Sequence, residues 1–239
     1  APIMFGEAWV ATPAPIGHRA ETRGKIVAST RPRNRFYRGQ LVRAMLGFHE
    51  FQQYMIGDFE NAKQIQKAGD DHPRAVHINR VINDRIDNLP GDLGSAIFVL
   101  EESLYYWGSG DEQKVVSKPH LFLFRESESG QVELVTYNNP EGINLENSDK
   151  SWQLDYNKLE KSWFPPCRYI TKADGFHLSA STDLPNGLTF TLSEVIRKDQ
   201  LQVYEFLTTA DGKLAGVATS PEPSNPSFAY KTPLLYDRK

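Results

Sequence analysis

The sequence has little of what several common protein classes require. It holds a single cysteine, Cys167, which excludes an internal disulfide framework and a four-cysteine zinc site. No apolar run approaches the roughly 18 residues of a membrane-spanning helix, so we expect no membrane span. The formal net charge is only −3, which gives no general attraction for nucleic acid or an anionic membrane surface. We therefore expect no nucleic-acid partner.

Short catalytic motifs are also missing. The sequence contains no Gly-x-Ser-x-Gly elbow, no P-loop, no GxGxxG after a predicted strand and no HExxH pair. Its six histidines are scattered along the chain, so a metal site is not expected. The sequence therefore assigns no catalytic residue, and it leaves open whether the protein is an enzyme.

Charge is distributed unevenly along the chain. Residues 1–46 carry eight basic and two acidic side chains, a net charge of +6, whereas the remaining residues have a net charge of −9. We interpret the Pro- and Arg-rich residues 1–38 as a basic arm and residues 39–239 as a single domain with a leading helix. The arm could fold back onto the acidic body, meet an anionic partner or be solvated.

The printed chain begins with Ala1 and Pro2 rather than methionine, so we expect that its N-terminus has been processed. A secreted or organelle-lumenal location is then favoured over the cytoplasm, although a lone thiol is compatible with either. The sequence does not fix the oligomeric state, and a homo-oligomer is possible.

Helical periodicity is confined to the early part of the chain. From Gln40 to about Gln66, apolar residues recur mainly at spacings of three and four. This spacing predicts one helix to about Tyr54 and a second from about Asn61, with a break at Gly57-Asp58.

After this region the apolar residues alternate with a period of two, which is typical of strands. The predicted strands are about 76–83, 95–106, 120–125, 132–137, 168–171, 176–181, 188–197, 201–208 and 228–236. Ala173-Asp174-Gly175 and Ala210-Asp211-Gly212 each predict a tight hairpin. Short strands with turns every 8–12 residues or so, and no alternating helices, predict a mainly β fold, either a sandwich or a barrel.

Two adjacent carboxylates, Glu101 and Glu102, lie inside a strongly apolar predicted strand. Successive side chains of a strand point to opposite faces, so one of the two should face the interior. A buried carboxylate is costly unless it is paired. It could meet an N–H or hydroxyl group of a ligand, or it could form a salt bridge at the barrel mouth with Arg80, Arg85 or Arg125.

Aromatic residues recur at alternate strand positions, and tryptophans lie near strand ends. A barrel of about eight to ten strands has room for one small ligand, and aromatic walls suit a flat conjugated one. The rings could equally fill the core. The residues expected to contact a ligand are Glu101, Tyr105, Trp107, His120, Phe122, Phe124, Tyr137, Trp163, Cys167, Phe190 and Tyr204.

Cys167 follows Pro165-Pro166 and opens a predicted strand. It could tether a ligand, take part in thioether transfer or be inert. Arg168 is its only basic sequence neighbour, so the pattern does not argue for a lowered pKa of the thiol.

Five segments, in order, resemble the CpcT/CpeT family of phycobiliprotein chromophore lyases. The first, FHEFQQYMIGDFENAKQI, presents Met55, Gly57, Phe59, Asn61 and Gln64 at the spacing of the family's opening motif. The second segment is AIFVLEESLYY, residues 96–106. Glu101 occupies the position of the glutamate in the family's strand motif, and Glu102 replaces the glutamine that follows it. The other matching segments are residues 120–140, 167–181 and 192–216.

The resemblance implies a calycin-like, lipocalin-shaped antiparallel β-barrel that binds a linear tetrapyrrole, or bilin. Family members transfer the bilin to a cysteine of a phycobiliprotein. The basic stretch that suits the bilin propionates is Arg-rich in the family, whereas residues 114–119 here offer only lysines, which lack bidentate geometry. The resemblance therefore supports the family's fold for this chain more strongly than it supports the family's lyase activity.

We therefore expect a barrel that binds a small hydrophobic chromophore, a bilin or a carotenoid, as a chromoprotein or pigment carrier. One alternative is a chromophore lyase in which Glu101 donates or accepts a proton. The other is a structural or interaction barrel without a ligand.

Overall fold

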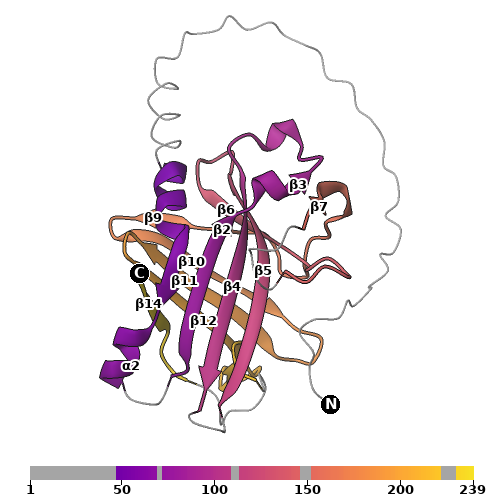
Figure 1. Ribbon diagram of the computed structural model, residues 1–239. Helices are drawn as coiled ribbons and strands as arrows, with labels where there is room; N and C mark the ends of the chain where they lie inside the picture. Colours follow the sequence, from indigo (N-terminus) through magenta and orange to yellow (C-terminus); the bar gives the residue numbers. More distant parts are fainter. Residues whose placement is uncertain (1–46, 69–71, 109–112, 146–151, 222–229) are drawn as a thin grey trace, which may run out of the picture.

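The computed structural model describes residues 47–68, 72–108, 113–145, 152–221 and 230–239 (Figure 1). The expected basic arm at 1–38 lies outside these residues. Within them the protein is mainly β, with helical residues 47–55 and a short helix α2 (Ala62–Ala68) near the start. None of the described helices has the length and apolar character needed to cross a membrane.

The described strands form one large antiparallel sheet. Its strands are β1 (Gly57–Glu60), β2 (Arg74–Val81), β4 (Ile97–Trp107), β5 (Lys114–Glu126), β6 (Val132–Tyr137), β8 (Cys167–Arg168), β9 (Ile170–Lys172), β10 (Gly175–Asp183), β11 (Thr189–Arg197), β12 (Gln200–Thr208), β13 (Leu214–Val217) and β14 (Leu234–Arg238). The order across the sheet is β8-β6-β5-β4-β2-β1-β14-β12-β11-β10-β9, and β13 also pairs with β12.

The sheet curls until its two ends meet. Its terminal strands, β8 and β9, follow one another in the chain with only Tyr169 between them; β8 pairs with β6 and β9 with β10, so this one segment joins the two sides of the sheet into a nearly closed barrel (Figure 1). The prediction of a mainly β antiparallel barrel is confirmed, and the sandwich alternative is wrong. Both predicted hairpins form, at the β9–β10 and β12–β13 connections.

The expected break at Gly57-Asp58 is instead the start of a strand. β1 pairs with β2 on one side and with β14 on the other. The ring of Phe59 explains this, because it is fully buried in the barrel core. A four-residue strand between two helices is too short for its alternation to be recognised in the sequence.

Strand β4 is buried on both faces, which accounts for its nearly continuous apolar sequence. One face contributes Val99, Tyr105 and Trp107 to the barrel interior, here called the lumen. The opposite face contributes Phe98 and Leu100 to a second cluster outside the barrel. That cluster is covered by segments that carry β3 (Ile86–Asp87), β7 (Leu154–Asp155), η1 (Asn83–Arg85), η2 (Gly91–Leu93) and η4 (Tyr156–Lys158).

Helical residues 47–55 close one end of the barrel. Phe48, Phe51 and Met55 are buried in the main core. The Phe51 ring packs within about 5 Å of three core rings, those of Phe124 (5.0 Å), Tyr169 (5.1 Å) and Phe176 (5.2 Å). The apolar side chains of this helix therefore insert into the barrel core at that end.

Arg238, the penultimate residue, holds this helix in place. Its guanidinium group donates to backbone carbonyls at the helix C-terminus, where a positive charge is favoured by the helix dipole. The acceptors are the carbonyls of Gln53 (2.9 Å), Tyr54 (2.6 Å) and Ile56 (2.7 Å). Gly57 makes room for the guanidinium, because a Cβ atom there would lie 2.5 Å from Nη1 of Arg238 and the φ angle is +142°.

We expect Arg238→Gln to lower the free energy of unfolding by about 1.5–3 kcal/mol, since it removes charge-assisted hydrogen bonds to several carbonyls. Arg238→Lys should restore little of the loss, because an ammonium group lacks the planar fork. The control is Lys239→Gln, which removes only the exposed pair with Glu60 and should change stability by less than about 1 kcal/mol. Urea unfolding of the three variants checks this, and equal midpoints for Arg238→Gln and Lys239→Gln would contradict the proposed role.

Candidate functional site

A buried hydrogen-bond network crosses the lumen. Nδ1 of His77 lies 3.3 Å from Oε1 of Glu101 and 3.2 Å from Oγ of Ser103. Its Nε2 lies 2.9 Å from the hydroxyl of Tyr236 and 3.2 Å from that of Tyr105. All five side chains are at least nine-tenths buried. The network joins β2, β4 and β14 through a single imidazole.

The register of β2 against β4 creates this cluster. His77 pairs with Ser103 and Asn79 pairs with Glu101, so these side chains share one face of the sheet. The apolar residues Val76 and Ile78 occupy the other, half-exposed face of β2. In the middle of β2 the polar residues His77 and Asn79 are therefore buried while Val76 and Ile78 are half-exposed, the reverse of ordinary amphipathic alternation.

The expectation that one of the paired glutamates faces the interior is confirmed, and the inward residue is Glu101. The expected salt bridge at the barrel mouth is wrong, because Glu101 pairs with His77. Arg80 instead pairs with Asp58 (2.5 Å), Arg125 pairs with Glu133 (2.5 Å), and the guanidinium of Arg85 lies over the Trp152 ring (4.9 Å).

The carboxylate of Glu101 is ionised. Burial alone would raise its pKa, but the attraction of His77 and hydrogen bonds from His77 and Ser103 outweigh burial and lower the pKa to about 2. Oε1 accepts from Ser103 at 2.9 Å. Oε2 is buried and accepts no hydrogen bond from the described residues.

A second buried acceptor lies beside Glu101. Oδ1 of Asn79 likewise has no hydrogen-bond partner among the described residues. The orientation of its amide is set by Nδ2, which donates to the Met55 carbonyl at 3.0 Å. Directly opposed residues in neighbouring strands have Cβ atoms about 4.5–5.5 Å apart. Two buried acceptor oxygens without a donor among the described residues therefore belong to directly opposed residues of β2 and β4.

Glu194 is a second buried acid, and it enters from β11. Its Oε2 accepts a hydrogen bond from the hydroxyl of Tyr169. Burial raises the pKa of Glu194 to about 8, and the negative charge of Glu101 adds to the rise. At neutral pH Glu101 is thus ionised and Glu194 protonated, an arrangement that separates a proton acceptor from a proton donor.

The network is suited to binding or proton relay rather than to nucleophilic attack. Ser103 and Glu101 both meet the same nitrogen of His77, while the other nitrogen meets two tyrosine hydroxyls. In a nucleophilic triad the serine and the carboxylate contact opposite nitrogens of the imidazole. Ser103 is therefore not positioned as an activated nucleophile.

Most of the predicted ligand-contacting residues face the lumen. Those on its inner face are Glu101, Tyr105, Trp107, His120, Phe122, Phe124 and Phe190. Tyr137 instead belongs to the second cluster outside the barrel. Tyr204 lies on the opposite face of β12 from Val203 and donates to the carbonyl of Tyr230 at 2.8 Å. A ligand contact at any of these positions stays a prediction.

Cys167 and Trp163 lie where the sheet ends meet. Trp163 is 54% exposed, and its ring packs 5.6 Å from Phe190. Cys167 is partly buried, and burial with the charges of Glu194 and Glu133 raises the pKa of its thiol to about 12. The thiol is therefore protonated and unreactive at neutral pH.

Sequence reasoning did not single out His77, Asn79, Glu194 or Tyr236. Glu194 interrupts an alternating apolar face formed by Leu192 and Ile196, and that interruption was a usable signal. The contribution of Tyr236 could not be foreseen, because it depends on β14 pairing with β1 and β12 across the barrel.

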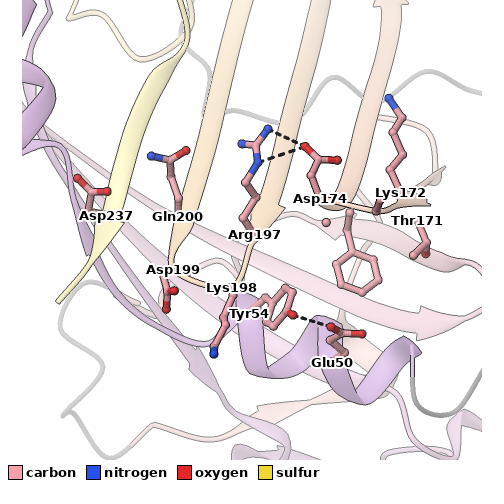
Figure 2. A pocket seen from close by; sticks show the side chains of 13 residues that line it. Glu50, Tyr54, Thr171, Lys172, Asp174, Arg197, Lys198, Asp199, Gln200 and Asp237 are labelled. Carbon is pink, nitrogen blue, oxygen red and sulfur yellow. Dashed lines mark hydrogen bonds and ion pairs between the residues drawn. The ribbon is translucent and has the colours of Figure 1, made fainter.

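A separate polar hollow of about 540 Å³ lies outside the lumen, beside the closing helix (Figure 2). It is bounded by the helix and by the β9–β10 and β11–β12 turns. Tyr54 donates to Glu50 at 2.5 Å, and Arg197 pairs with Asp174 at 3.0 Å (Figure 2). These internal pairs satisfy much of its charge, so we assign it no ligand.

The fold and the lumen define this protein as a nearly closed antiparallel β-barrel with a polar network inside. Among solved structures it is similar to a selenomethionine-labelled CRL protein of Arabidopsis, with a TM-score of 0.52 and 10% sequence identity. The match covers 83% of this chain and 98% of that one. No protein-family model and no curated protein matches the chain. At this identity the likeness shows the fold alone.

We expect Glu194 to make stability depend on pH. The pKa of this carboxyl is raised from about 4.5 to about 8 on folding, so its stabilising effect is complete below pH 4.5 and is lost as the pH rises through 8. Glu194→Gln should remove up to about 1.4 kcal/mol of pH dependence per pH unit in this interval. Urea unfolding from pH 5 to 9 measures it. The exposed Glu128→Gln variant should follow the unchanged protein, and parallel profiles for both variants would exclude a buried neutral Glu194.

Proposed function

We propose that the barrel binds a conjugated, largely apolar small molecule with N–H donors, a linear tetrapyrrole, inside its lumen. The observation that carries this proposal is the pair of buried acceptor oxygens, Oε2 of Glu101 and Oδ1 of Asn79, on adjacent strands. A buried acceptor left without a donor costs about 1–3 kcal/mol, so a ligand that supplies two donors gains that much at each oxygen.

Two acceptors favour a bilin over a carotenoid. The pyrrole rings of a linear tetrapyrrole carry N–H groups, whereas a hydrocarbon carotenoid would cover both oxygens without satisfying either. The ionised state of Glu101 strengthens hydrogen bonds from N–H donors. The likeness of five sequence segments to bilin-binding lyases supports the same choice.

Flat aromatic surfaces beside these acceptors suit a planar ligand. The imidazole of His120 and the ring of Phe122 are nearly parallel, at 5.6 Å and 6°. His120 is the direct β5 partner of Glu101, so these rings are on the same face as the acceptors and about one strand spacing away. A conjugated ligand that donates to Glu101 can therefore stack against them.

Chromophore lyase activity is a second candidate, supported by the two carboxyl groups in different protonation states. Addition of a partner's thiol to a double bond of the pigment forms an S–C bond and moves one proton to carbon, so it needs no co-reactant. Glu194 could hold that proton and Glu101 could receive one. The unreactive Cys167 is consistent with an acceptor thiol on another protein.

We expect the protein to bind biliverdin with a change in its visible absorption. Glu101→Gln should weaken binding about 10- to 100-fold and shift the absorption maximum, because it replaces a charge-assisted acceptor by a neutral one. The control is Glu102→Gln, which changes the neighbouring side chain on the opposite face of β4 and should leave affinity unchanged.

The same titration separates the candidate functions. Equal affinities of the Glu101→Gln and Glu102→Gln variants for biliverdin would show that Glu101 is not in the binding site. If biliverdin causes no spectral change in the unaltered protein, the proposal that the barrel binds a bilin fails. Incubation of the pigment-loaded protein with an apo-phycobiliprotein tests the lyase. Pigment that remains attached to the phycobiliprotein after denaturation would mean covalent transfer, and the protein would then be a lyase rather than a pigment carrier only.

A further inference from the structure

The barrel is closed along only part of its height. β6 pairs with Leu121–Glu126 of β5, which leaves residues 115–120 without a strand on that side among the described residues. On the other side of the barrel, β9 pairs only with Gly175–His177 of β10. Residues 178–183 of β10 therefore have β11 on one edge and no paired strand on the other among the described residues. The continuous segment 167–172 joins β6 to β10, and the two edges that extend beyond it border one gap in the strand pairing, here called the seam.

The seam is bordered by aromatic residues on one side and small residues on the other. Ser162 donates its backbone N–H to the carbonyl of Thr136, which brings Trp163 alongside the end of β6. The inward residues of β10 at this height are Ala180 and Thr182, whereas at the closed end they are Phe176 and Leu178. The β10 side of the seam therefore carries small inward side chains, and the rings of Trp163 and Phe164 pack against Phe190, the strand partner of Thr182.

Inward residues next to the seam remain partly exposed. His120 and Phe122 belong to the inner face of β5 yet are only half-buried. Trp163 is 54% exposed, while the Phe190 ring that it contacts is buried and lies opposite Thr182. Partly exposed rings at the seam thus adjoin buried rings of the lumen.

Both ends of the barrel are covered by the chain itself. The closing helix inserts Phe51 at one end. At the other end, Trp107 donates to the carbonyl of Thr219 at 3.2 Å, Lys118 donates to the carbonyl of Ala218, and Tyr230 stacks on Trp107. The described residues therefore favour a lateral route over an axial one.

We infer that the seam is the entrance to the lumen and that it admits a flat conjugated molecule, which passes between Trp163 and the His120–Phe122 pair to reach Glu101. The identity of the molecule rests on the proposed function, whereas the route rests on the strand pairing and on the exposure of these side chains. His120 is one strand away from Glu101, so a ligand that enters here meets the acceptor pair directly.

The test is to fill the seam and to follow both His120 and the pigment. Ala180→Trp places a large ring at the inner face of β10, and the control Ser179→Trp places the same ring on its exposed outer face. We expect diethyl pyrocarbonate to modify His120 but not the buried His77. Ala180→Trp should slow modification of His120 at least tenfold, and Ser179→Trp should leave it unchanged; mass spectrometry of peptides measures both.

Stopped-flow association with biliverdin gives the second readout, and Ala180→Trp should slow it by at least tenfold. Unchanged modification of His120 in Ala180→Trp, or an unreactive His120 in the unaltered protein, would overturn the inferred route. If no variant binds biliverdin, the proposed function fails, while selective protection of His120 still establishes the entrance. Thr182→Trp repeats the test at the next inward position should Ala180→Trp fail to fold, as circular dichroism would show.

Discussion

The rest of the lumen depends on keeping the Glu101 carboxylate charged inside an apolar barrel. Removing such a charge from water is expensive unless a partner and hydrogen bonds compensate. His77 and Ser103 compensate for one oxygen, and the tyrosines behind His77 fix the imidazole. This requirement determines which face of β2 is buried, because His77 must point inward even though Val76 then does not.

Two further contacts make that interior possible. The closing helix excludes water from one end, and Arg238 holds it there by capping its last carbonyls. Tyr169 joins the sheet ends and at the same time donates to Glu194. One side chain therefore links closure of the barrel to the protonation of its second acid.

The fold was largely predictable from the sequence, and the site was predictable only in part. Period-two alternation and turn residues such as Asp174-Gly175 are local signals, so they identified the strands and hairpins. The paired glutamates correctly indicated an inward carboxylate. The partner of Glu101 was missed because His77 and Tyr236 come from strands far apart in the sequence. Tyr137 lies in the cluster outside the barrel, and alternation could not have indicated this, because it does not reveal which face of β6 turns inward when both faces are buried.

The unpaired edge of β10 has a consequence for association between molecules. A free strand edge is a template on which another chain can add a strand and begin aggregation. The outward residues of this edge are Ser179, Ser181 and Asp183, which are all exposed and polar, and the strand ends at the charged one. Exposed polar and charged side chains of this kind disfavour the addition of a strand from another molecule, so they offset the hazard that an incomplete wall creates.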